Sequence, residues 1–147
     1  MNTKITWKQF EKDIASLVKK IPKGKFNKLL IVSKGGLIPG YFLAKELGID
    51  LVQTICVKTE RKEGLKPVPH FITSKAGDDF GWLVVDDLID SGETMKHILE
   101  KMPRASAAVL YLKELTYKQQ KEGGRKLPEN IFYSKYVKPD WVDFPWE

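Results

Sequence analysis

Apolar residues follow two patterns along the chain, and each pattern predicts a different kind of secondary structure. An apolar residue at every third or fourth position predicts amphipathic helices over residues 6–20, 37–47 and 93–102. Short runs of mostly apolar residues predict buried strands at residues 29–32, 51–57, 82–85 and 105–112. Strands that alternate with helices in this way predict an α/β fold, with a Rossmann-like parallel sheet flanked by helices.

Single residues mark the ends of the predicted helices, and others are expected in the hydrophobic core. Thr6 is the expected N-cap of the first helix, and Gly48 stands at the expected C-cap of the second. Cys56, Trp7 and Trp82 are interpreted as core residues.

Two segments show neither the helical periodicity nor an apolar run. Residues 58–69 hold six charges, two prolines and one glycine, which predicts a long exposed loop of the kind that is usually functional or disordered. A short strand is expected at residues 71–73. Residues 113–147 are interpreted as irregular, so we expect one domain with a core over about 1–112 and an appendage over about 113–147.

Composition narrows the class of protein. The 147 residues suit a single domain, and no apolar run approaches the roughly 18 residues of a membrane-spanning helix. The N-terminus lacks the apolar core of a secretory signal, and the single cysteine, Cys56, cannot form an internal disulfide. We therefore expect a cytoplasmic protein without a membrane anchor.

The net charge of +6 suits an anionic partner without identifying it. Nucleic acid, acidic lipid and a polyphosphate metabolite would all be attracted, and a solvated surface of lysines explains the charge equally well.

A glycine-rich segment, Ser33–Gly40, follows the first predicted strand and precedes a helix. Its glycines let backbone amides approach an anion, and the helix dipole adds to the attraction. Tyr41 stands where a P-loop would have its lysine, which excludes a Walker A site. A plain turn between a strand and a helix is the alternative interpretation.

The segment Trp82–Thr94, WLVVDDLIDSGET, carries a stronger signal. We expect it to deliver the carboxylates of Asp86, Asp87 and Asp90 into one loop that leads to a helix. Hydroxyl groups and free amides at that helix N-terminus can surround a phosphate. Carboxylates beside a phosphate make sense if they hold ribose hydroxyls and a hard divalent cation, although a helix cap with surface carboxylates is the simpler alternative.

Three segments also resemble a known family. Val84–Thr94 resembles the phosphoribosyl pyrophosphate (PRPP) signature of type I phosphoribosyltransferases, in which two acids are followed by Asp-Ser/Thr-Gly-x-Thr. Val32–Ile49 is similar to the pyrophosphate loop and helix of bacterial xanthine-guanine phosphoribosyltransferases, and Pro139–Glu147 is similar to their purine-covering hood. The resemblance implies the type I phosphoribosyltransferase fold with a small C-terminal hood.

The resemblance also implies a role for each matching residue. Ser33, Lys34 and Gly35 would hold pyrophosphate, and Asp86 and Asp87 would bind the ribose hydroxyls and Mg²⁺. Asp90 would act as the acid/base group near purine N7. The 5′-phosphate cradle would consist of Ser91, Gly92, Glu93 and Thr94. Lys113 would donate to purine O6, Trp141 would stack on the base, and the main chain of Val142 would read its 2-position.

The implied function is purine salvage: transfer of the phosphoribosyl group from PRPP to guanine, xanthine or hypoxanthine, giving a nucleoside monophosphate and pyrophosphate. A homo-dimer or homo-tetramer that does not bind nucleic acid is expected. The alternative is a non-catalytic regulator of the same fold that senses nucleotides and binds nucleic acid. Orotate and adenine are disfavoured as substrates because the lysine donor Lys113 suits a carbonyl rather than an amine.

Overall fold

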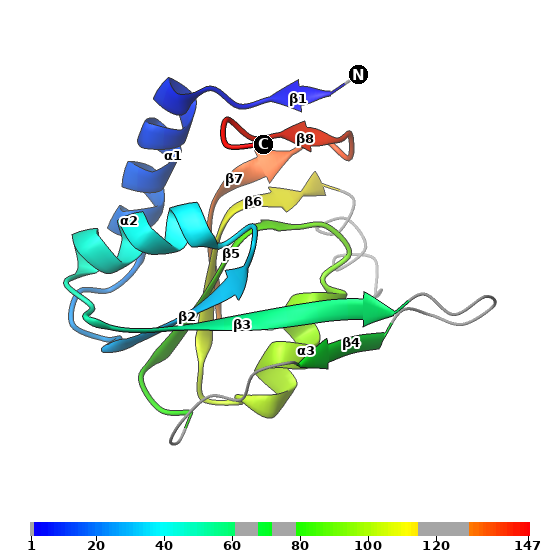
Figure 1. Ribbon diagram of the computed structural model, residues 1–147. Helices are drawn as coiled ribbons and strands as arrows, with labels where there is room; N and C mark the ends of the chain where they lie inside the picture. The colour runs from blue at the N-terminus through cyan, green and yellow to red at the C-terminus, as the bar shows by residue number, and fades with distance from the viewer. Residues whose placement is uncertain (1, 61–67, 72–78, 115–129) are drawn as a thin grey trace.

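The computed structural model describes residues 2–60, 68–71, 79–114 and 130–147. These residues form a six-stranded sheet in the order β4-β3-β2-β5-β6-β7 and a two-stranded sheet, β1-β8 (Figure 1). The strands are β1 (Thr3–Lys4), β2 (Lys28–Ser33), β3 (Leu51–Glu60), β4 (Val68–Phe71), β5 (Trp82–Ile89), β6 (Ser106–Lys113), β7 (Ile131–Val137) and β8 (Val142–Asp143). The helices are α1 (Trp7–Lys20), α2 (Leu37–Leu47) and α3 (Glu93–Lys101).

The predicted α/β class is confirmed. Every neighbouring pair in the larger sheet is parallel except β3 and β4, which are antiparallel. Helices α1 and α2 cover one face of this sheet and α3 covers the other (Figure 1). A separate apolar cluster fills each interface: Phe10, Leu17 and Leu43 lie in one, and Met95 and Ile98 in the other.

The helix limits follow from their caps, as the sequence predicts. The Thr6 hydroxyl accepts a hydrogen bond from the Gln9 amide at 3.1 Å, which satisfies a free donor at the start of α1. Gly48 ends α2 with φ of 66°, a left-handed conformation that glycine adopts without steric cost. Among the described residues, no helix has the length and apolar composition needed to cross a bilayer.

The order of the strands fixes where a ligand can bind. From β2 the chain crosses through α2 to β3 on one side, whereas β5, β6 and β7 follow one another on the other side. The strand order therefore reverses between β2 and β5, which makes this point a topological switch point of the sheet. In open parallel sheets, ligands bind beyond the carboxyl ends of the strands at such a switch point. The loop after β2 and the end of β5 thus lie where a ligand is expected.

Some sequence predictions are wrong in their limits. Strand β5 continues to Ile89, so Asp86 and Asp87 lie within a strand and not in the loop that was expected to carry them. The ends of the predicted loop over residues 58–69 belong to β3 and β4, while residues 61–67 lie outside the described residues. Residues 131–137, predicted to be irregular, form β7 of the main sheet.

Two residues expected in the core are exposed. Trp7 is 50% exposed at the start of α1, and Cys56 is exposed on β3. Trp82 is buried, as predicted. The division into a core over about 1–112 and a hood over about 113–147 stays a prediction.

Candidate active site

The loop after β2 packs directly against the end of β5. Gly35 lies so close to Asp87 that an added Cβ atom would be 2.5 Å from the Asp87 Oδ2 atom. An added Cβ at Gly36 would be 2.4 Å from the main-chain oxygen of Val85. Only glycine permits this approach. The peptide bond between Ser33 and Lys34 is cis, the Lys34 side chain is exposed, and the Ser33 hydroxyl donates to the carbonyl of Ile55 at 3.3 Å.

Asp86 and Asp87 form a half-buried, like-charged pair on β5. The Asp87 amide donates to Oδ1 of Asp86 at 2.9 Å. Burial, together with the negative charge of Asp87, raises the pKa of Asp86 well above its ordinary value. Burial also raises the pKa of Asp87, and the charge of Glu147 adds to that rise. The pair therefore favours a proton or a cation.

A cavity of about 110 Å³ opens between the end of β5 and the start of α3. This volume is several times that needed for one buried water. The cavity is therefore large enough for a phosphate group. Gly92, with φ of 84°, is the N-cap of α3, so the positive end of the helix dipole faces this region. The lining residues are Asp86, Leu88, Ile89, Asp90, Ser91, Gly92, Thr94 and Met95.

The family resemblance implies a phosphate cradle of four residues, and three of them line this cavity. Ser91, Gly92 and Thr94 line it, while Glu93 lies in the first turn of α3 without appearing in the lining. The Ser91 hydroxyl accepts a hydrogen bond from the Glu93 amide at 3.4 Å. This contact orders the turn that leads into the helix.

Lys113 and Asp90 form an ion pair at the carboxyl ends of neighbouring strands. The Lys113 Nζ atom lies 3.1 Å from Oδ1 of Asp90. The Lys113 side chain is 9% exposed and that of Asp90 is 72% exposed, so a buried ammonium holds a carboxylate that faces solvent. Because Asp90 also lines the cavity, the pair connects the end of β6 with the start of α3. The sequence did not predict this contact.

Trp141 immediately precedes strand β8, and Val142 is its first residue. Trp141 is 65% exposed, whereas the Val142 side chain is buried. Within the described part of the chain, no hydrogen bond or ion pair joins either residue to the other candidate site residues. The charge of Glu147 acts on Asp87, which brings the end of the chain into the electrostatic field of the site.

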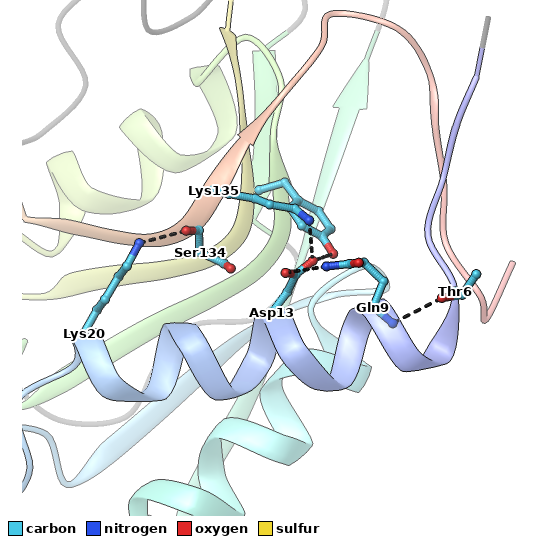
Figure 2. Close-up of polar contacts among 7 residues, drawn as sticks. Thr6, Gln9, Asp13, Lys20, Ser134 and Lys135 are labelled. Carbon is cyan, nitrogen blue, oxygen red and sulfur yellow. Dashed lines mark hydrogen bonds and ion pairs between the residues drawn. The ribbon is translucent and has the colours of Figure 1, made fainter.

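A buried carboxylate that the sequence analysis missed supports the sheet behind the site. Asp13 of α1 accepts from the Tyr111 hydroxyl at 2.6 Å and from the Gln9 amide group at 2.9 Å, and Lys135 Nζ lies 3.0 Å from it. Figure 2 shows Gln9 and Lys135 converging on Asp13. Burial and the Asp13 carboxylate raise the pKa of Tyr111.

A signal for this cluster was present in the sequence. Asp13 comes three residues after Phe10 and four before Leu17, which places a charge on the apolar face of the helix. The cluster joins α1 to β6 and β7, and the end of β6 carries Lys113.

Comparisons with known proteins agree with this fold. The chain belongs to the phosphoribosyl transferase family, because the model of the phosphoribosyl transferase domain matches residues 5–147. It is 31% identical over 144 residues to a xanthine-guanine phosphoribosyltransferase of Nitratidesulfovibrio vulgaris (strain DP4), covering 97% of this chain and 83% of that one. It is 29% identical over 149 residues to a xanthine-guanine phosphoribosyltransferase of Chromohalobacter salexigens, covering 97% of this chain and 82% of the relative.

A solved structure supports the same assignment. The crystal structure of a purine phosphoribosyltransferase from Pyrococcus horikoshii Ot3 superimposes with a TM-score of 0.79 at 27% sequence identity. The alignment covers 99% of this chain and 93% of that chain. The family resemblance stated from the sequence is confirmed.

Proposed function

We propose that this protein is a purine-salvage phosphoribosyltransferase that joins a 6-oxopurine to PRPP and releases pyrophosphate. The observation that carries the proposal is the ion pair of Lys113 and Asp90 beside the cavity at the start of α3. Guanine presents O6 and N7 as adjacent acceptors on one edge. A lysine donor next to a carboxylate matches the same edge of a free 6-oxopurine, which has a carbonyl at position 6 and a proton on N7.

The reaction assigns a separate role to each member of the pair. Transfer breaks the bond between C1′ of PRPP and the pyrophosphate oxygen and forms a bond between C1′ and purine N9. As N9 attacks, the proton on N7 passes to Asp90, which acts as the general base. Lys113 donates to O6 and orients the base. When the purine enters, these contacts replace the direct contact between the two side chains.

The cavity at α3 suits the 5′-phosphate of PRPP. Amides around Gly92, with the hydroxyls of Ser91 and Thr94, offer donors at the positive end of a helix. Glu93 completes the same turn and contributes through its main chain. Lys34 and the Gly35 amide bind the pyrophosphate at the end of β2, and Lys34 stabilises the charge that develops on this leaving group.

Asp86 and Asp87 are suited to a hard divalent cation that accompanies PRPP. Within the described ranges, no three His, Cys, Asp or Glu side chains gather in a metal-binding cluster. Mg²⁺ is typically held by one or two carboxylates plus substrate oxygens and water, so a half-buried pair of carboxylates fits it. Bound Mg²⁺ would neutralise charge on the pyrophosphate. Asp86 and Asp87 also accept hydrogen bonds from the ribose hydroxyls.

The hood segment completes the base site. Trp141 exposes a ring on which a purine can stack, and base–aromatic stacks contribute about 1–3 kcal/mol. The main chain of Val142 reads the substituent at position 2. Stacking provides affinity for any purine, so the choice among bases falls to Lys113.

The protein acts in the cytoplasm as a homo-dimer or homo-tetramer, and it needs neither nucleic acid nor a membrane anchor. Light scattering at micromolar concentration tests the assembly, and a monomer would contradict it.

The activity is tested by incubating the protein with PRPP, Mg²⁺ and guanine, xanthine or hypoxanthine. We expect one nucleoside monophosphate and one pyrophosphate for each base consumed, identified by mass spectrometry. A regulator of the same fold would bind nucleotides without turnover. The absence of product with all three bases, from a folded protein, would therefore overturn the proposal in favour of that alternative.

A further inference from the structure

The hood strand β8 is held along one edge by the N-terminal strand β1. The Thr3 amide donates to the carbonyl of Trp141 at 2.8 Å, and the Ile5 amide donates to the carbonyl of Asp143 at 2.9 Å. The two strands are parallel, with Thr3 opposite Val142. They lie side by side near both chain ends (Figure 1). Residues almost a full chain length apart in sequence therefore meet at the base-binding segment.

This pairing determines which way the Val142 peptide groups point. In an extended strand, the N–H and C=O of one residue point to the same side, and those of the next residue point to the opposite side. The carbonyls of Trp141 and Asp143 both face β1. The N–H and C=O of Val142 therefore face away from β1, along the other edge of β8. That edge is where a purine could meet main-chain donors and acceptors.

Side-chain packing holds the same strands independently of these hydrogen bonds. Ile5, Val142 and Phe144 are buried. The Trp146 ring stacks on Phe144 with centroids 4.7 Å apart and meets the edge of Phe10 of α1 at 5.4 Å. The apolar contacts attach the hood to α1, so a change to one β1 amide can alter the position of β8 without removing this packing.

We propose that the Thr3 amide of β1 is a positioning group for base recognition. Its hydrogen bond to the carbonyl of Trp141 fixes the main chain between Trp141 and Val142. It thereby sets the position of the Trp141 ring relative to the purine and the direction of the Val142 peptide group. This inference rests on the proposed function. Thr3 does not touch the substrate, and its effect falls on binding of the base and not on PRPP.

The sheet register supplies a matched pair of variants. Thr3→Pro removes the N–H that bonds to Trp141, whereas Lys4→Pro removes an N–H that alternation turns away from β8. Proline restricts the preceding residue to extended conformations, which a strand already has. Lys4 is exposed, so its replacement removes no core contact.

The test compares steady-state constants of the two variants with those of the unchanged protein, together with nucleoside monophosphate binding by calorimetry. For Thr3→Pro we expect KM for the base and Kd for the nucleotide to rise about 2- to 10-fold, the effect of one hydrogen bond, with KM for PRPP unchanged. Lys4→Pro is expected to match the unchanged protein. If Thr3→Pro does not fold, deletion of residues 2–4 removes the same bond and is judged by the same criteria.

Three results would overturn the proposal: equal behaviour of both proline variants, an equal rise in KM for PRPP, or loss of folding in both the Thr3→Pro variant and the deletion. The last would show that β1 is needed for stability alone. The unchanged protein separates this inference from the function on which it rests. If it does not form nucleotide, the proposed function has failed; if it does and Thr3→Pro leaves base binding unaltered, only the role of Thr3 has failed.

Discussion

Replacing Gly35 with alanine tests whether the loop after β2 and the carboxylate of Asp87 form one site. The new Cβ would lie 2.5 Å from Oδ2 and 2.6 Å from Oδ1 of Asp87. Non-bonded heavy atoms prefer a separation of about 3.5–4.0 Å. Either the carboxylate or the loop must therefore move by about 1 Å to relieve the contact.

The expected effect is larger on catalysis than on stability. A displacement of about 1 Å in a positioning group can lower the rate about 10²-fold, which corresponds to about 2.7 kcal/mol. Overpacking usually costs about 1–3 kcal/mol of folding free energy. We expect the lower end of that range because the Asp87 side chain can rotate away, whereas a main-chain atom cannot.

Kinetics with varied PRPP and thermal unfolding measure the two effects in the same variant. Gly36→Ala is the comparison, because its Cβ would lie 2.4 Å from the carbonyl oxygen of Val85 and 2.7 Å from that of Val32. Those atoms belong to the central strands, so this variant should lose more stability than Gly35→Ala. Wild-type kcat/KM for PRPP in Gly35→Ala would show that Asp87 and the loop do not act together.

Three further outcomes concern the carboxylates. Excess EDTA should abolish turnover and added Mg²⁺ should restore it, and undiminished activity in the chelator would contradict a role for the metal. Asp90→Asn should keep the fold and PRPP binding but slow the reaction about 10²–10⁴-fold, as loss of a general base does; a wild-type rate would reduce Asp90 to a structural loop residue. Because the pKa of Asp86 is raised in the folded protein, stability should fall as pH rises from its ordinary value of 3.8 through the folded value. In EDTA, Asp86→Asn should therefore melt higher than the unchanged protein at pH 8, and a lower melting temperature there would contradict the reasoning.

Helices and strands with a clear hydrophobic pattern could be predicted from the sequence. Helix α2 has the predicted limits, residues 37–47, because its periodicity ends at a glycine that can cap it. Strands β2, β5 and β6 were found from apolar runs, since both faces of their central residues are buried. The site motif on β5 could be found because its residue types follow one another directly in the chain.

Contacts between distant residues could not be predicted in the same way. Strand β7 was missed because its apolar residues are interrupted by Ser134 and Lys135, so no continuous run marks it. Cys56 is exposed although its segment is mostly apolar, because β3 is little covered by other elements: among residues 51–57 only Ile55 is buried. The pairing of β1 with β8 and the contact between Lys113 and Asp90 depend on the assembled fold, and no local pattern encodes them.

The central claim is that a 6-oxopurine is selected by Lys113 and stacked by Trp141. The most direct test is kcat/KM for guanine, xanthine, hypoxanthine and adenine in the unchanged protein, in Lys113→Ala and in Trp141→Ala. A site built to bond a specific group can reject an analogue lacking it by about 10⁴–10⁵, so the unchanged protein should use 6-oxopurines and not adenine. Trp141→Ala should weaken all accepted bases alike, and Lys113→Ala should reduce the preference for a 6-oxo group. Efficient use of adenine by the unchanged protein, or an unaltered ranking of bases in Lys113→Ala, would contradict the claim.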